Sequence, residues 1–252
     1  AIVTVILLGY WAVMALIPVP IDEVISQALV NGEVLRNSGP VPVTGLNQLS
    51  TQWIAANLEP GTNLAAWIDR VATPGRLWEK TWDPEGLFST IPAIATGITG
   101  MLAGSMIVSD KPQEKKILWL FGVGFLSFMF GSIWNWFFPF NKNLWTSSFV
   151  LYTTGLATLT LAASLFFVDM QGYKKWTRPG IIFGANAITA YVLAGVLARL
   201  FSIFKIKPVL FDGLVSLGIS PKFSSLIFAL GFTALCYIPV YFLYKRKIFI
   251  KL

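Results

Sequence analysis

Long apolar runs recur along the whole chain and are separated by polar connections. Six of these runs approach the roughly 20 residues that a helix needs to cross the hydrocarbon core of a bilayer. They cover residues 1–17, 87–108, 117–138, 146–168, 180–204 and 223–244. The connections after residue 87 are short, so neighbouring helices are expected to pack antiparallel. The pattern predicts an all-α integral membrane protein, a polytopic helix bundle with about six transmembrane helices and a long extracytoplasmic loop.

One long polar stretch, residues 18–86, separates the first two apolar runs. Up to residue 61 it is rich in Gly, Pro, Asn and Ser, a composition typical of irregular loops. Residues 63–71 are expected to form a short interfacial helix, because Asn63 suits the N-cap and apolar side chains recur with helical spacing. These apolar positions are Leu64, Trp67, Ile68 and Val71.

The polar stretch ends at residues 82–86 (Trp-Asp-Pro-Glu-Gly), directly before the second apolar run. One interpretation is an N-terminal helix cap, since acidic residues are favoured at the positive end of the helix dipole. The other is one wall of a site in which Asp83 or Glu85 binds a hydroxyl or an amine, or accepts its proton. Arg70 is the expected counter-charge of the outer carboxylates.

Composition excludes a soluble protein, because 12% of the 252 residues are charged whereas soluble domains average about 25%. We therefore expect one transmembrane domain over residues 1–252, with residues 18–86 as an extracytoplasmic loop and residues 245–252 as a cytoplasmic tail. The single cysteine, Cys236, excludes an intrachain disulfide. The lack of histidine removes the commonest general base and metal ligand, and no metal is expected.

The net charge of +7 is explained by membrane topology better than by nucleic-acid binding, because the basic residues lie between the apolar runs. One set of connections is strongly basic, and the positive-inside rule places it in the cytoplasm. Its members are Lys111, Lys115, Lys116, Lys174, Lys175, Arg178, Lys245, Arg246, Lys247 and Lys251. The opposite connections hold Lys142, Lys205, Lys207 and Lys222. Both ends of the chain are then cytoplasmic, and the expected location is a bacterial inner membrane.

The first run starts without an initiator Met and without a basic segment, so it does not match a signal peptide. We expect the chain to be the C-terminal part of a longer protein.

Two polar residues within the fifth run are candidates for chemistry. Arg199 either faces a polar cavity or forms a buried ion pair, or it extends its side chain to the membrane surface. Asn186 stands among small residues, where its amide either hydrogen-bonds a neighbouring helix or lines a substrate cavity.

A further candidate cluster surrounds the connection between the third and fourth runs, with Asn141, Lys142 and Trp145. Its aromatic residues suit a membrane-interface belt, and Thr146 or Ser147 suits the cap of the next helix. An aromatic and amide lining also suits a sugar ring. Neither a P-loop, a GxGxxG nor a GxSxG motif is present.

Five sequence blocks together resemble a known family. They are NLAAWIDR at residues 63–70, LWEKTWDPEGLFSTIPAIATGITGMLAG at 77–104, FPFNKNLWTSSFVLYTTGLA at 138–157, the basic loop GYKKW at 172–176 and FGANAITAY at 183–191. In this order they are similar to the heparan-α-glucosaminide N-acetyltransferase family and its bacterial homologues, some of which carry the label of N-acetylglucosamine-related transporter. The resemblance covers roughly residues 60–245.

The resemblance implies a transmembrane acetyltransferase that moves acetyl from cytoplasmic acetyl-CoA, its co-substrate, to the amine of an extracytoplasmic, glucosamine-type sugar. The family's key histidine lies in its N-terminal part and is absent here, so the catalytic base is expected outside this chain. The basic connection at 174–178 either attracts the phosphates of CoA or only sets topology. The candidate substrate-binding residues are Trp82, Asp83, Glu85, Asn141, Lys142, Trp145, Asn186 and Arg199.

The expected partners are the lipid bilayer, an amino sugar or glycan, and a second copy in a homodimer; nucleic acid is not expected. The alternative function is transport of N-acetylglucosamine or a related sugar, although the sequence shows no internal repeat of the kind many transporters have. A structural membrane subunit is a third interpretation.

Overall fold

The computed structural model describes residues 1–30, 53–75 and 77–250. The chain divides into two compact units, Ala1–Met170 and Gln171–Leu252. Residues 31–52 of the expected irregular loop, and Lys251 of the expected cytoplasmic tail, lie outside the described residues. The expectation of a single domain stays a prediction.

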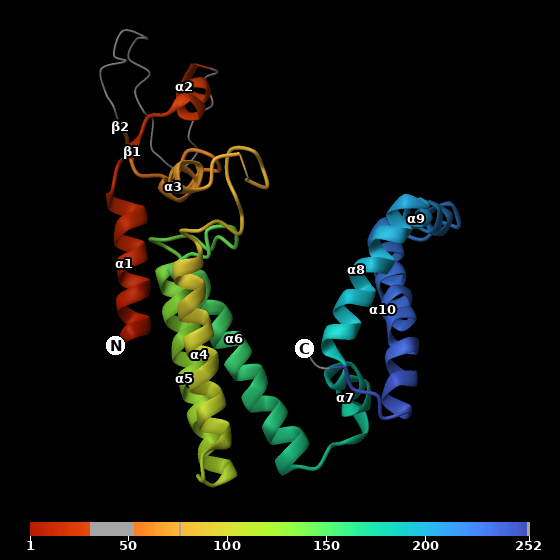
Figure 1. Ribbon diagram of the computed structural model, residues 1–252. Helices are drawn as coiled ribbons and strands as arrows, with labels where there is room; N and C mark the ends of the chain where they lie inside the picture. The colour runs from red at the N-terminus through yellow and green to blue at the C-terminus, as the bar shows by residue number, and fades with distance from the viewer. Residues whose placement is uncertain (31–52, 76, 251–252) are drawn as a thin grey trace. The chain divides into compact units, whose positions relative to one another are not determined.

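The first unit is built on four apolar helices (Figure 1). They are α1 (Ile2–Leu16), α4 (Thr90–Val108), α5 (Gln113–Trp134) and α6 (Ser147–Ser164), and α6 continues into a π-helical segment, η1 (Leu165–Met170). Short connections make α4, α5 and α6 successive antiparallel neighbours, and α1 packs against α4 and α6.

Among the described residues, four helices are long and apolar enough to cross a membrane: α4, α5, α6 with η1, and α10 (Pro221–Lys245). A bent helix pair in the second unit raises this number to five if it forms one span. The first of the six expected spans is the 15-residue helix α1, which is shorter than the others. The all-α, polytopic membrane architecture is therefore confirmed.

Part of the polar stretch is more regular than its composition predicts. Strand β1 (Val19–Pro20) pairs antiparallel with β2 (Trp53–Ile54), and α2 (Glu23–Val30) follows β1. The carboxylate of Asp22 accepts the backbone N–H of Ile25 at 3.0 Å and so caps α2. The prediction of an irregular loop up to residue 61 is wrong for these segments, because strand pairing between distant residues leaves no local pattern.

Helix α3 (Leu64–Ala72) confirms the short helix expected at residues 63–71. The side chain of Asn63 accepts the N–H of Ala66 at 2.9 Å, as expected for an N-cap. Leu64 is buried, while Val71 at the other end of the apolar stripe is exposed. The helix therefore packs into the unit chiefly through its first turn.

Close backbone contact holds α5 and α6 together. A Cβ on Gly131 would collide with the backbone of Ser148 and Tyr152, and a Cβ on Gly155 would collide with the backbone of Phe128. Glycine removes the side chains that would keep the two helices apart, as at many contacts between membrane helices. Main-chain packing therefore joins the second half of α5 to the first half of α6, on either side of their connection.

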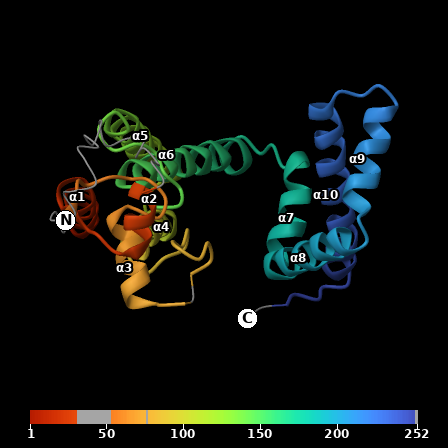
Figure 2. The ribbon, with the colours of Figure 1, turned by 90° about the horizontal axis from the view of Figure 1, so that it is seen from above.

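The second unit contains α7 (Arg178–Ala185), α8 (Ala187–Ile203), α9 (Ile206–Ser216) and α10. The span expected at residues 180–204 is not one continuous helix, because it breaks at Asn186 and turns by 77° (Figure 2), as in a broken span or a re-entrant pair. The expected plain connection between the fifth and sixth spans contains α9, which lies beside α10 (Figure 2).

Candidate functional site

The segment before α4 is held by two consecutive residues of α3, Asp69 and Arg70. Arg70 contacts three separate parts of the chain. Its guanidinium forms an ion pair with Asp22 at 2.7 Å. It also donates to the backbone oxygens of Gly61 at 2.5 Å and Thr81 at 2.7 Å. Its side chain is only 12% exposed. Arg70 was expected to be the counter-charge of Asp69, Glu79, Asp83 and Glu85, but its ion pair is with Asp22, a residue that sequence reasoning did not single out.

Asp69 fixes the other end of this segment and is 2% exposed. Its Oδ1 accepts the backbone N–H of Phe88 at 3.3 Å. Gly86 lies directly against this carboxylate, and a Cβ at that position would overlap it. Burial raises the pKa of Asp69 above its usual range, an effect that the N–H groups of Phe88 and Leu87 partly offset.

The helix-cap interpretation of residues 82–86 is wrong. Helix α4 begins at Thr90 with Ser89 as its N-cap residue, three residues beyond Gly86. The carboxylate of Asp83 instead accepts the N–H of Glu85 at 2.8 Å and that of Trp78 at 3.3 Å, which folds the segment into a compact turn. Asp83 and Trp82 are half-buried and Glu85 is exposed.

The connection between α5 and α6 carries the second predicted cluster and forms a turn built on side-chain amides and hydroxyls. Asn141 accepts the N–H groups of Asn143 at 2.9 Å and Leu144 at 3.2 Å. Thr146 is the N-cap residue of α6, but its hydroxyl does not cap the helix. It donates to the backbone oxygen of Pro139 and accepts the N–H of Asn141. Lys142 is exposed at the tip.

Tyr10 of α1 joins the two clusters. Its hydroxyl donates to the backbone oxygen of Leu144 at 2.7 Å. The centroid of its ring lies 5.3 Å from that of Phe88, at the entry to α4, and 6.4 Å from that of Phe138, in the connection that follows α5. The segment with Trp82, Asp83 and Glu85 and the turn with Asn141, Lys142 and Trp145 therefore lie at the same end of the first unit.

A groove of about 530 Å³ begins at this end and runs between α4 and α6. Trp145 lines this end of the groove, and its indole Nε1 donates to the hydroxyl of Thr96 at 3.0 Å. Deeper in the groove the hydroxyls of Thr99 and Thr154 lie 3.3 Å apart. The rest of the lining is small or apolar: Gly100, Ala103, Gly104, Ile107, Phe149, Thr153, Ala157, Thr158 and Leu161.

The other two predicted site residues belong to the second unit. Asn186 is fully buried at the break between α7 and α8, and its amide binds the end of the chain. It donates to the backbone oxygen of Ile248 at 3.1 Å and accepts the N–H of Ile250 at 3.0 Å. Arg199 is exposed on α8. The assignment of all these residues to substrate binding stays a prediction.

Sequence reasoning missed Tyr10, Asp22 and the groove threonines. The groove had a usable signal, because Thr96, Gly100 and Gly104 follow one another at four-residue spacing, as do Thr154 and Thr158. Residues at this spacing share one face of a helix.

Curated proteins from mouse and human match this chain. Heparan-alpha-glucosaminide N-acetyltransferase of Mus musculus is 32% identical over 182 residues, which is 69% of this chain and 26% of the mouse protein. The Homo sapiens protein of the same name is 30% identical over 183 residues, with the same shares. The family resemblance is confirmed. The chain spans about a quarter of the length of these relatives. No protein-family model matches it.

Proposed function

We propose that this chain forms part of a membrane acetyltransferase that transfers acetyl from acetyl-CoA to the amine of an extracytoplasmic amino sugar. The observation that carries the proposal is the 32% identity over 182 residues to a protein named as a glucosaminide N-acetyltransferase. Two features of the first unit support it: carboxylates and aromatic rings gather at one end of the helices, and a groove leads away from that end.

The reaction breaks the C–S bond of the thioester and forms a C–N bond to the sugar amine. The attacking nitrogen gives up its proton to a base, and CoA leaves as the thiol after taking up a proton. The carbonyl oxygen, which gains negative charge during attack, needs hydrogen-bond donors. The chain has no histidine, and we assign the base to the histidine that the family carries in its N-terminal part.

The residues of this chain are proposed to bind and orient the acceptor. Glu85 is exposed and suits the cationic amine, while Asp83 shapes the turn that presents it. Trp82 and Trp145 offer ring faces to the sugar, and amide or ammonium donors come from Asn141 and Lys142. In this proposal the sugar docks at the end of the first unit that Tyr10 organises.

The groove between α4 and α6 is proposed as the path along which the acetyl donor reaches the sugar. It extends from Trp145 at the acceptor end to Ile107 and Leu161 near the opposite ends of their helices. Hydroxyls such as Thr99 and Thr154 offer hydrogen bonds to amide or thioester groups, and the small residues leave room for an extended chain.

A transport function is the second candidate, and one observation favours it. Broken helices are typical of secondary transporters, in which the freed backbone groups bind substrate or ions. The 77° break between α7 and α8 has this form. Here, however, the buried amide at the break is bound by the chain's own end through Ile248 and Ile250.

An assay on inverted membrane vesicles separates the two functions. The vesicles contain the full-length protein from its native host. Labelled acetyl-CoA is added outside the vesicles, and glucosamine is enclosed inside them. Labelled N-acetylglucosamine inside the vesicles is the expected product. Saturable uptake of N-acetylglucosamine without any acetyl transfer would overturn the enzyme proposal and support the transporter.

Glu85→Gln tests the acceptor site within the same assay. Loss of one charge-assisted hydrogen bond to the ammonium is expected to raise the KM for glucosamine about tenfold. The KM for acetyl-CoA should not change. Glu79→Gln is the matched control, because Glu79 is an exposed carboxylate of the same segment. Equal KM values in the two variants would remove Glu85 from the site.

A further inference from the structure

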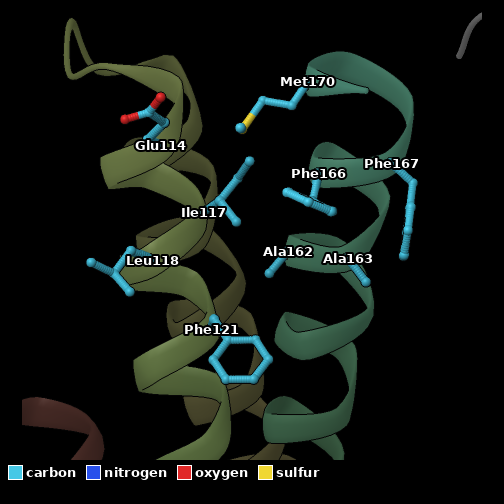
Figure 3. Close-up of a pocket in the computed structure, with 9 residues that line it drawn as sticks. All are labelled: Glu114, Ile117, Leu118, Phe121, Ala162, Ala163, Phe166, Phe167 and Met170. Carbon is cyan, nitrogen blue, oxygen red and sulfur yellow. The ribbon is translucent and has the colours of Figure 1, made fainter. Parts of the chain in front are cut away.

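A second cavity in the first unit lies between α5 and α6, toward the end where α5 begins. The two helices touch through their backbones near Gly131 and Gly155, then separate and leave a wedge of about 460 Å³ (Figure 3). Glu114 stands at the end of the wedge, in the first turn of α5. The remaining lining is apolar: Ile117, Leu118, Phe121, Ala162, Ala163, Phe166, Phe167 and Met170.

The π-helical segment at the end of α6 shapes one wall of this wedge. A π-helical turn places more residues in each turn than an α-helix does, and such turns are frequent at functional sites. In Figure 3 the side chain of Met170 reaches from this segment toward α5, while Ile117 and Phe121 reach back from α5. Flexible or flat apolar side chains therefore bound the wedge on both sides, and such a lining suits an extended hydrocarbon chain.

The surroundings indicate what that guest is. Membrane-protein helices are solvated by lipid, and an apolar cavity does not retain water, so an acyl chain is the natural filling. The wedge ends at the polar connection before α5, at headgroup depth for a helix that spans the bilayer. Lys111 and Lys115, three positions before and one position after Glu114 in the sequence, are exposed at this end of α5. Lys116 is already engaged, because its Nζ donates to the backbone oxygen of Ile107 at 2.8 Å.

We propose that the wedge binds one acyl chain of a phospholipid with a primary-amine headgroup, such as phosphatidylethanolamine. The ammonium donates hydrogen bonds to Glu114, and the phosphate lies near Lys111 and Lys115. A choline headgroup has no N–H group, so it cannot donate to the carboxylate. The site therefore selects an amine-bearing lipid over its choline counterpart. This inference is independent of acetyl transfer.

Native mass spectrometry of the full chain tests the proposal. The protein is reconstituted with equal amounts of phosphatidylethanolamine and phosphatidylcholine, then extracted and analysed for retained lipid. Wild-type protein is expected to retain phosphatidylethanolamine preferentially. Met170→Trp fills the wedge and should abolish retention. Met129→Trp is the matched control, because Met129 lies on α5 outside the wedge and both methionines are 40% exposed. Its retention should equal that of wild type.

Glu114→Gln separates the contribution of the lipid headgroup to binding from that of the acyl chain. Glu114 is exposed, so its replacement does not disturb packing, and acidic residues in a first helical turn contribute little beyond a dipole effect. Lipid retention should persist in this variant while the preference for phosphatidylethanolamine falls about fivefold.

Three results would overturn the proposal. They are a wild-type protein that retains no phospholipid, equal retention in Met170→Trp and Met129→Trp, and an unchanged headgroup preference in Glu114→Gln. A lipid-free dimer whose assembly Met170→Trp disrupts would assign the wedge to a second copy of the chain instead. If Met170→Trp fails to fold, the headgroup preference of Glu114→Gln still determines the outcome.

Discussion

Gly86 leaves room for a buried carboxylate where any side chain would displace it. Gly86→Ala places a methyl group on the Asp69 carboxylate, so either the carboxylate or the entry to α4 must move. Overpacking of this kind costs about 1–3 kcal/mol of stability. We expect a lower midpoint in thermal unfolding, followed by tryptophan fluorescence. Gly97→Ala in α4 is the control, since nothing lies within 4 Å of a Cβ there. Equal midpoints for the two variants would contradict the predicted clash.

The raised pKa of Asp69 makes stability depend on pH in a defined direction. An unfolded aspartate ionises near 3.8, while burial holds the folded one protonated to higher pH. Above 3.8 the unfolded chain therefore binds fewer protons than the folded chain, and stability falls as pH rises through the folded pKa. Asp69→Asn keeps an acceptor for the N–H of Phe88 but cannot ionise.

We expect unfolding midpoints of Asp69→Asn to decline less with rising pH than those of wild type. Asp110→Asn, which removes an exposed carboxylate, should reproduce the wild-type slope. A wild-type slope in Asp69→Asn would show that another group governs the pH dependence.

Hydrogen bonds between residues close in the sequence could be predicted from the sequence, whereas contacts between distant residues could not. Asn63 was identified as a cap because its partner, Ala66, is three residues away. The acids of residues 82–86 suggested the same role, but Asp69, from an earlier helix, holds the entry to α4. The Arg70–Asp22 pair spans 48 positions in the chain. No periodicity encodes such a contact, so the sequence identified the segment but not the residues that fix it.

At the scale of elements, Arg70 ties α3 to the start of α2 and to two loops. Arg70→Lys keeps the charge but loses the planar set of donors that reaches Asp22, Gly61 and Thr81 together. The expected loss is about 1.5–3 kcal/mol, the value of a hydrogen bond to a charged group. Denaturant unfolding measures it, and proteolysis near Thr81 should become faster. Arg178→Lys, at an exposed site, should behave as wild type.

The contact between α5 and α6 depends on glycine in both helices. Gly155→Ala would drive a methyl group into the backbone of Phe128, and the helices would have to separate. We expect a loss of about 1–3 kcal/mol. Gly122→Ala on α5 has open space around its Cβ and should be neutral or slightly stabilising. The midpoint of thermal unfolding in detergent distinguishes the two variants, and similar values would refute close packing at Gly155.

Helix positions followed from hydropathy, but the break at Asn186 did not. An amide among small residues is compatible with a continuous membrane helix, which is why residues 180–204 read as one span. The break is compensated by hydrogen bonds from Asn186 to the chain's end, 62 and 64 positions away. Helix α9 was missed because its sequence, with Pro208 and Gly213, resembles a connection.

Whole-molecule topology depends on whether α7 and α8 cross the membrane together. If they form one span, the basic connections before α7 and after α10 lie on the same side, as the positive-inside rule requires. If they form a re-entrant pair, α10 reverses direction and its basic end, Lys245 to Lys247, lies outside. Charge favours the first arrangement, because this end is the most basic connection in the second unit.

The accessibility of introduced cysteines shows directly whether α7 and α8 cross the membrane as one span. Cys236 is the only cysteine in the 252 residues of this chain, so Cys236→Ser leaves the chain without thiols. In intact cells, a membrane-impermeant maleimide should label Lys142→Cys and Leu217→Cys but not Lys174→Cys or Lys247→Cys; all four positions are exposed in the structure. Labelling of Lys247→Cys with protection of Leu217→Cys would establish a re-entrant pair. Labelling of Lys174→Cys instead of Lys142→Cys would invert the whole molecule and place the acceptor end of the groove in the cytoplasm.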